Sequence, residues 1–195
     1  MKAHLREDIQ RLLISGYGER PPEVDDTVPA AAAGGFDDTI AIPPNRPLVE
    51  SARQVFEASG DLFLAASANS IAGGLALTEG DLSEARKRTQ RAAEFLHALG
   101  DEITLQMVLR TLALIAGRTG EPERAAQIHG FAARLVADTG GVRFDAPFES
   151  EDALELASRT IGRERADEEW RKGQQMTRDE AMAVARALGN SDAQP

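Results

Sequence analysis

The amino-acid sequence predicts an all-α protein built from stacked helical hairpins. Its central part, residues 60–140, contains one unit that occurs twice with a period of 40 residues. Inside each copy, small residues keep the same spacing on both sides of a glycine turn. Two antiparallel helices need such small side chains where their backbones approach closely. The matching positions are Gly60 and Gly100, Gly80 and Gly120, Ala85 and Ala125, and Ala92 and Ala132, with Gly140 closing the second copy.

Glycines and capping residues divide residues 48–189 into about seven or eight predicted helices. Asp81 with Glu84, and Thr177 with Glu180, have the spacing of a capping box at a helix start. Gly73, inside one predicted helix, indicates close packing of two backbones, because an interior glycine costs about 1 kcal/mol relative to alanine. The predicted helices span residues 48–58, 61–78, 81–99, 101–118, 122–138, 150–161, 163–172 and 177–188.

The chain divides into four parts. Residues 1–14 form a predicted N-terminal helix, and residues 15–47 form a flexible acidic linker rich in proline, glycine and alanine. The helical-repeat domain spans residues 48–189, and residues 190–195 form a frayed tail. The helix at 48–58 is the second helix of a hairpin without its first, so we expect the N-terminal helix to cap the exposed edge of the array.

Composition excludes several classes of function. The chain has 195 residues and a formal net charge of -10, which argues against direct nucleic-acid binding because phosphate neutralisation needs clustered Lys and Arg. The absence of cysteine excludes disulfides, a thiolate nucleophile and a cysteine zinc site. The charged N-terminus and the lack of a long apolar run predict a cytoplasmic protein that does not enter the membrane.

The sequence predicts no catalytic residue, no metal ligand and no cofactor. Glu94 and His97 form a Glu-x-x-His pair, but a di-metal site in a helical bundle needs a second such pair, which does not occur. An enzyme that uses these two residues is therefore the least favoured alternative. We expect His129 to pack between helices, and neighbouring acids such as Glu168 and Glu169 to lie on solvated faces.

The spacing of the small residues is similar to the tetratricopeptide pattern, whose usual period is about 34 residues. Asn69 and Leu109 depart from it at a large aromatic position. The C-terminal runs Ile161-Gly162-Arg163-Glu164, Trp170-Arg171-Lys172-Gly173 and Met176-Thr177-Arg178-Asp179-Glu180-Ala181 resemble the close of the helical-repeat region in large actinobacterial regulators. Those regulators join a signal-transduction ATPase to LuxR-type or other output domains in transcriptional regulation. The resemblance implies a tetratricopeptide-like repeat arm used for regulation and protein contact.

We therefore expect a noncatalytic protein–protein interaction or regulatory module, with a small-ligand sensing domain as the alternative. The first helices of stacked hairpins line the concave side of an array, so their free faces form the expected groove. Cationic heads over an apolar floor suit a protein or an acidic peptide, and a second copy of the chain is a further expected partner. The alternative is that the arginines pair with nearby acids. The groove residues are Met107, Arg110, Leu114 and Arg118, with Ser70 from the preceding unit.

Overall fold

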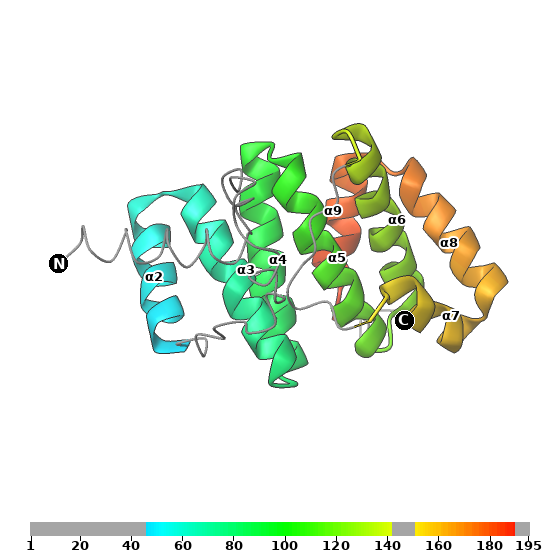
Figure 1. Cartoon of the computed structure of the whole chain (residues 1–195), viewed down its shortest axis with the longest axis horizontal. Helices are drawn as coiled ribbons and strands as arrows, with labels where there is room; N and C mark the ends of the chain where they lie inside the picture. Colours follow the sequence, from blue (N-terminus) through cyan, green and yellow to red (C-terminus); the bar gives the residue numbers. More distant parts are fainter. Residues whose placement is uncertain (1–45, 142–150, 190–195) are drawn as a thin grey trace, which may run out of the picture.

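A computed structural model describes residues 46–141 and 151–189, and within these ranges all regular structure is α-helical. The prediction of an all-α fold of stacked helical hairpins is confirmed (Figure 1). The predicted N-terminal helix, the linker up to residue 45 and the tail lie outside the described residues. The helices are α2 (Arg46–Ser59), α3 (Leu62–Thr78), α4 (Leu82–Leu99), α5 (Glu102–Arg118), α6 (Pro122–Asp138), α7 (Ala153–Ile161), α8 (Arg163–Gln175) and α9 (Arg178–Ala187).

Each of the helices α2 to α6 is followed, within two residues of its end, by a glycine in the left-handed region. Only glycine adopts this conformation without steric cost, and it lets the next residue bond back to the preceding helix. At the turn after α3, for example, the N–H of Asp81 donates to the carbonyl of Ala76 at 2.9 Å. The chain therefore reverses direction at regular intervals. These glycines are Gly60, Gly80, Gly100, Gly120 and Gly140, with φ of 74°, 82°, 70°, 83° and 91°.

An aspartate after three of these glycines starts the next helix. The carboxylates of Asp61, Asp81 and Asp101 each accept a hydrogen bond from a backbone N–H in the first turn, at 3.0 to 3.2 Å. Such a bond satisfies one of the free N–H groups at a helix start. The capping box of Thr177 and Glu180 at the start of α9 is confirmed in full.

The helices form a row of hairpins. α3 pairs with α4 and α5 pairs with α6, while α2 packs on α3, and α7 and α8 form a further pair against α6. The α2–α3 and α4–α5 turns lie along one edge of the row, and the α3–α4 and α5–α6 turns along the opposite edge (Figure 1). α9 returns to pack against α4 and α6.

Small residues allow the two helices of a hairpin to touch, as the spacing predicts. A Cβ atom on Gly73 would lie 2.5 Å from the Thr89 hydroxyl and 3.2 Å from the Ala85 carbonyl, so only glycine fits there. Ala85 and the equivalent Ala125 are completely buried. The close backbone packing predicted at Gly73 is therefore confirmed.

The contact between α6 and α8 is closer still. A Cβ atom on Gly130 would lie 2.1 Å from the Trp170 carbonyl oxygen, and one on Gly173 would lie 2.0 Å from the Gln127 carbonyl oxygen. Beside this crossing, the indole N–H of Trp170 donates to His129 Nδ1 at 3.2 Å. His129 thus packs between two helices, as expected.

Glu169 contradicts the prediction that neighbouring acids lie on solvated faces. Its side chain is 3% exposed and faces α6, where it accepts a hydrogen bond from Gln127 at 2.6 Å. Lys172 also donates to it at 2.9 Å. Burial raises the pKa of this carboxyl, but the hydrogen bonds from Lys172 and Gln127 outweigh burial, so the pKa is lowered overall.

We predict that Gly130→Ala destabilises the protein because the added methyl group collides with the backbone of α8, which cannot move independently. Overpacking of this kind costs about 1–3 kcal/mol, more than the roughly 1 kcal/mol that alanine gains in a helix. The control is Gly117→Ala on α5, where the three atoms nearest to the added Cβ all belong to the Leu156 side chain, the first at 2.8 Å. Urea denaturation should show a lower midpoint for Gly130→Ala than for Gly117→Ala, and equal midpoints would contradict the close crossing.

Candidate functional site

The structure buries three of the five predicted groove residues. Met107, Arg110 and Leu114 on α5 are at most 5% exposed, while Ser70 on α3 is partly buried. Every residue of α5 from 105 to 116 is buried, and α7 packs on the same helix near its C-terminal end. The spacing on one helix placed these side chains on one face but could not reveal what covers that face. Their role in partner binding stays a prediction.

Arg118 has an ion-pair partner. Its Nε atom lies 2.9 Å from Glu151 Oε1, and its side chain is partly exposed. The alternative in which this arginine pairs with an acid is therefore confirmed. Arg110 is 5% exposed, and the groove that the sequence predicts around these two arginines stays a prediction.

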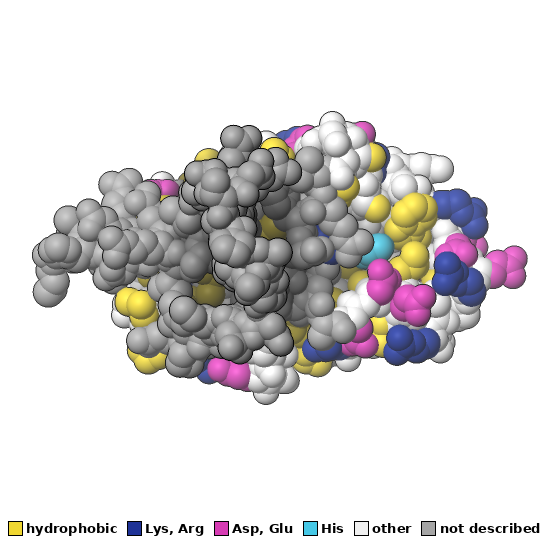
Figure 2. Space-filling view, viewed as in Figure 1, with side chains coloured by type: hydrophobic (Ala, Val, Ile, Leu, Met, Phe, Trp, Pro, Cys, Tyr) yellow, Lys and Arg dark blue, Asp and Glu magenta, His cyan; other side chains and the backbone are white. Residues whose placement is uncertain are grey.

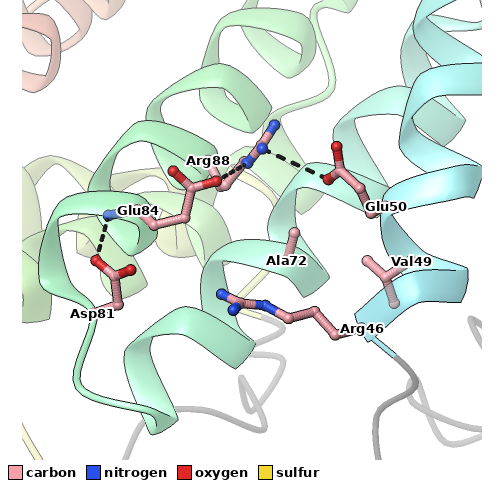
Figure 3. A pocket seen from close by; sticks show the side chains of 7 residues that line it. All are labelled: Arg46, Val49, Glu50, Ala72, Asp81, Glu84 and Arg88. Carbon is pink, nitrogen blue, oxygen red and sulfur yellow. Dashed lines mark hydrogen bonds and ion pairs between the residues drawn. The ribbon is translucent and has the colours of Figure 1, made fainter.

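A pocket of about 340 Å³ lies between α2, α3 and α4. Val49 and Ala72 form its apolar floor, and the Arg46 side chain extends from α2 past Ala72 (Figure 3). The remaining lining residues are charged and come from α2, α4 and the turn before α4: Glu50, Asp81, Glu84 and Arg88.

Most charged side chains of the pocket take part in ion pairs. Arg88 bonds Glu84 at 2.6 Å and lies 3.6 Å from Glu50, so it joins α4 to α2 (Figure 3). Arg46 pairs with Glu79 at 3.2 Å. A charged ligand would have to compete with these ion pairs, whereas the floor of Val49 and Ala72 is open to an apolar group.

Glu50 and Arg53 stabilise one wall of the pocket. The hydrogen bond from Arg53 lowers the pKa of Glu50 to about 2, and the positive charge of Arg88 contributes further. The same bond raises the pKa of Arg53. Arg53 also bonds Glu57 at 2.8 Å, and the amide of the buried Asn69 donates to that carboxylate at 2.9 Å. The network therefore ties α2 to both helices of the first hairpin.

Three of the four exposed large apolar side chains in the described residues lie next to the α2–α3 and α4–α5 turns, and the fourth is Val55 on α2. Phe63 is the second residue of α3 and Ile103 the second residue of α5, so they occupy equivalent positions in consecutive repeats. Leu99 ends α4 beside the same turn. These three side chains are between 44% and 50% exposed. The edge formed by Phe63, Leu99 and Ile103 is the apolar edge of the array.

The surface over α7 and α8 has a different character, because acidic and basic side chains alternate there (Figure 2). Arg163 pairs with Asp167 at 3.2 Å and Lys172 with Glu168 at 2.8 Å. Exposed pairs of this kind stabilise a helix only weakly. Charges of both signs are therefore mixed on this part of the described surface.

Glu94 and His97 form ion pairs with other residues and not with each other. Glu94 pairs with Arg91 at 3.1 Å and lies 3.9 Å from Arg186, and His97 lies 3.3 Å from Asp179. Within residues 46–141 and 151–189, no group of three His, Cys, Asp or Glu side chains is placed to hold a metal ion. None of the helices in these two ranges is long and apolar enough to cross a bilayer.

Comparisons with protein-family models, curated proteins and solved structures gave no significant match. The fold and the surfaces described above define an all-α protein of stacked helical hairpins. Its resemblance to the repeat regions of actinobacterial regulators stays a proposal.

Acid should weaken the link between Glu50 and Arg53. Because the folded pKa of Glu50 is lowered to about 2 from its ordinary 4.5, the stabilisation is fully present above pH 4.5 and is lost as the pH falls toward 2. Since the Glu50 side chain is 39% exposed, we expect Glu50→Gln to cost less than about 1 kcal/mol at pH 7. The difference in unfolding free energy between the wild type and Glu50→Gln, measured by urea titration, should be close to zero near pH 2.

The control is Glu79→Gln, because the pair of Glu79 with Arg46 is more exposed and joins no network. It should cost less than Glu50→Gln at pH 7. A cost of Glu50→Gln that is the same at both pH values would refute the assignment.

Proposed function

We propose that this protein is a noncatalytic interaction module that presents its apolar edge to another protein. The observation that carries the proposal is the exposure of Phe63, Leu99 and Ile103 along one edge of consecutive repeats. Exposed apolar groups that gather in one place mark protein–protein contact sites, whereas single exposed apolar residues are ordinary. The repeat arm of signal-transduction regulators, which the C-terminal sequence resembles, would have the same role.

The packing beneath the edge supports this proposal. The N-termini of α3 and α5 are fixed by the side-chain caps of Asp61 and Asp101, next to Phe63 and Ile103. A surface held in one conformation loses little entropy on binding. The edge would therefore offer a partner a preorganised row of apolar anchors.

The expected partner is a protein, without direct contact to nucleic acid or membrane. The net charge of -10 supports the exclusion of nucleic acid. An acidic peptide stays a further proposed partner, through the predicted groove residues Arg110 and Arg118. A role in bacterial signalling or transcription in the cytoplasm remains part of the proposal through the sequence resemblance alone.

The double variant Phe63→Ser, Ile103→Ser should lose partner binding while keeping its stability, because exposed side chains contribute about 0.5 kcal/mol or less. The test is affinity capture from cell extract with identification of the recovered proteins by mass spectrometry. The matched control is Val55→Ser, which removes a similarly exposed apolar side chain from another helix, α2. We expect Val55→Ser to recover the same proteins as the wild type; a double variant that also recovers them would rule out the apolar edge.

The second candidate function is sensing of a small ligand, and the pocket between α2, α3 and α4 favours it. Its volume of about 340 Å³ accommodates a small metabolite, and Val49 and Ala72 would contact the apolar part of that molecule. A ligand that binds only the folded protein raises the melting temperature by mass action.

A melting-temperature screen with small metabolites tests this second candidate. Any compound that binds in the pocket should lose its effect on Ala72→Leu, because the larger side chain fills the apolar floor. Ala98→Leu serves as the control, since Ala98 is exposed on α4 and does not line the pocket. An absence of shifts, or a shift that persists in Ala72→Leu, would count against the pocket.

A further inference from the structure

α9 packs between α4 and α6, and the surface that these two helices present to it is called the α4–α6 groove. Figure 1 shows α9 between these helices, behind α5. The apolar face of the helix is almost completely buried in this groove. That face consists of Ala181, Met182, Ala185 and Leu188, the last just beyond the end of the helix.

The groove binds the C-terminal end of α9 through its backbone. The amide of Gln90 on α4 donates to the carbonyl of Ala185 at 2.8 Å, and Arg124 on α6 donates to the carbonyl of Ala187 at 2.9 Å. The last carbonyls of a helix have no partner within the helix, so side chains of the groove supply one. These hydrogen bonds do not depend on the identity of the α9 side chains, in contrast to the burial of Ala185 and Leu188 at the same end.

Glu121 contributes a third backbone contact. It follows Gly120 at the position where the earlier turns carry an aspartate cap, but its side chain does not cap α6. Instead its carboxylate accepts a hydrogen bond from the N–H of Gly189 at 2.9 Å. Glutamate therefore replaces the aspartate of the earlier turns at the position that contacts the C-terminal end of α9.

The N-terminal end of α9 makes more exposed contacts. Arg178 pairs with Glu102 on α5, and Asp179 lies 3.3 Å from His97. The Asp179 side chain is almost fully exposed, and exposed pairs contribute little to stability. The buried apolar face and the backbone contacts therefore supply most of the affinity between helix and groove.

Only Met176 and Thr177 connect α9 to α8, and both have extended backbone angles, with ψ of 144° and 164°. α8 is fixed against α6 by the crossing of Gly130 and Gly173, independently of α9. A change of the backbone angles at these two residues would move α9 out of its groove without disturbing the other hairpins.

We propose that the groove between α4 and α6 also binds α9 of a second copy, so that two chains exchange their last helices. The structure shows that α9 fits between α4 and α6. In an exchanged dimer the same contacts of α9 would form between two chains, and only the backbone conformation of Met176 and Thr177 would change. A helix tethered in its own chain competes at an effective concentration on the order of millimolar. Exchange is therefore expected at high chain concentration, and it is independent of the apolar edge.

Cysteine pairing between two full-length variants tests this proposal, because the chain contains no cysteine of its own. Gln90→Cys marks the groove and Arg186→Cys marks α9; the Gln90 amide lies 3.5 Å from the carbonyl of residue 186. The two variants are mixed, unfolded in urea, refolded together at about 1 mM and equilibrated in a glutathione buffer. Each chain carries one thiol, so a disulfide between residues 90 and 186 requires two chains.

We expect the disulfide between residues 90 and 186 to form several times more often than one between residue 90 and the exposed Arg171→Cys on α8. Equal yields, or no excess of the first pair, would overturn the proposal. The double variant Gln90→Cys, Arg186→Cys, diluted to keep chains apart, shows whether the geometry permits the bond. If it does not, Glu94→Cys replaces Gln90→Cys, because the side chains of Glu94 and Arg186 approach to 3.9 Å.

Arg124→Ala provides an independent check. It removes the contact to the Ala187 carbonyl and leaves both cysteine positions unchanged. The Gln90→Cys chain already lacks the hydrogen bond to the Ala185 carbonyl, so Arg124→Ala removes a second of the three backbone contacts and should lower the yield of the disulfide with Arg186→Cys at least severalfold. Circular dichroism confirms that each variant is folded, and a yield unaffected by Arg124→Ala in folded protein would show that pairing does not involve the groove.

Discussion

The close approach of helix backbones through glycine and alanine is the constraint on which the rest of the structure depends. Gly73 faces Thr89 and the backbone of α4, and Gly130 and Gly173 bring α6 and α8 into contact. Alanines with no exposed surface lie at the equivalent positions of both hairpins. Dispersion and burial are strong at such distances, but the gain depends on the absence of larger side chains. The turns, the caps and the surfaces take their positions from this packing.

Polar interactions determine how neighbouring helices are joined rather than whether they form. The network of Glu50, Arg53, Glu57 and Asn69 ties α2 to the first hairpin, and Glu169 with Gln127 ties α8 to α6. Both networks bring a carboxylate together with its donors at a partly or fully buried site. A carboxylate left there without a donor would be costly, so each network specifies which helices can be neighbours. The pocket lies beside the first of these networks.

The sequence predicted the fold well because the relevant signals are local. Glycine turns, aspartate caps and regularly spaced small residues act within a single repeat, and the predicted helix bounds differ from the structure by less than one helical turn. The candidate surfaces were harder to predict because they depend on distant contacts. The burial of Arg110 and the pairing of Arg118 with Glu151 are set by packing that α5 alone does not encode. The exposure of Phe63 and Ile103 could have been suspected, since both follow the Gly-Asp turn at the same position.

The position of α9 also limits where a further hairpin could be inserted into the array. Repeat proteins lengthen by duplication of a unit, and the regularly spaced glycine turns would allow another hairpin to be inserted without a change of register. α9, however, bridges the second helices of two consecutive hairpins, with Gln90 in one and Arg124 in the other. A hairpin inserted between them would separate the two walls of its groove. The contacts of α9 therefore require that the hairpins of α4 and α6 be consecutive.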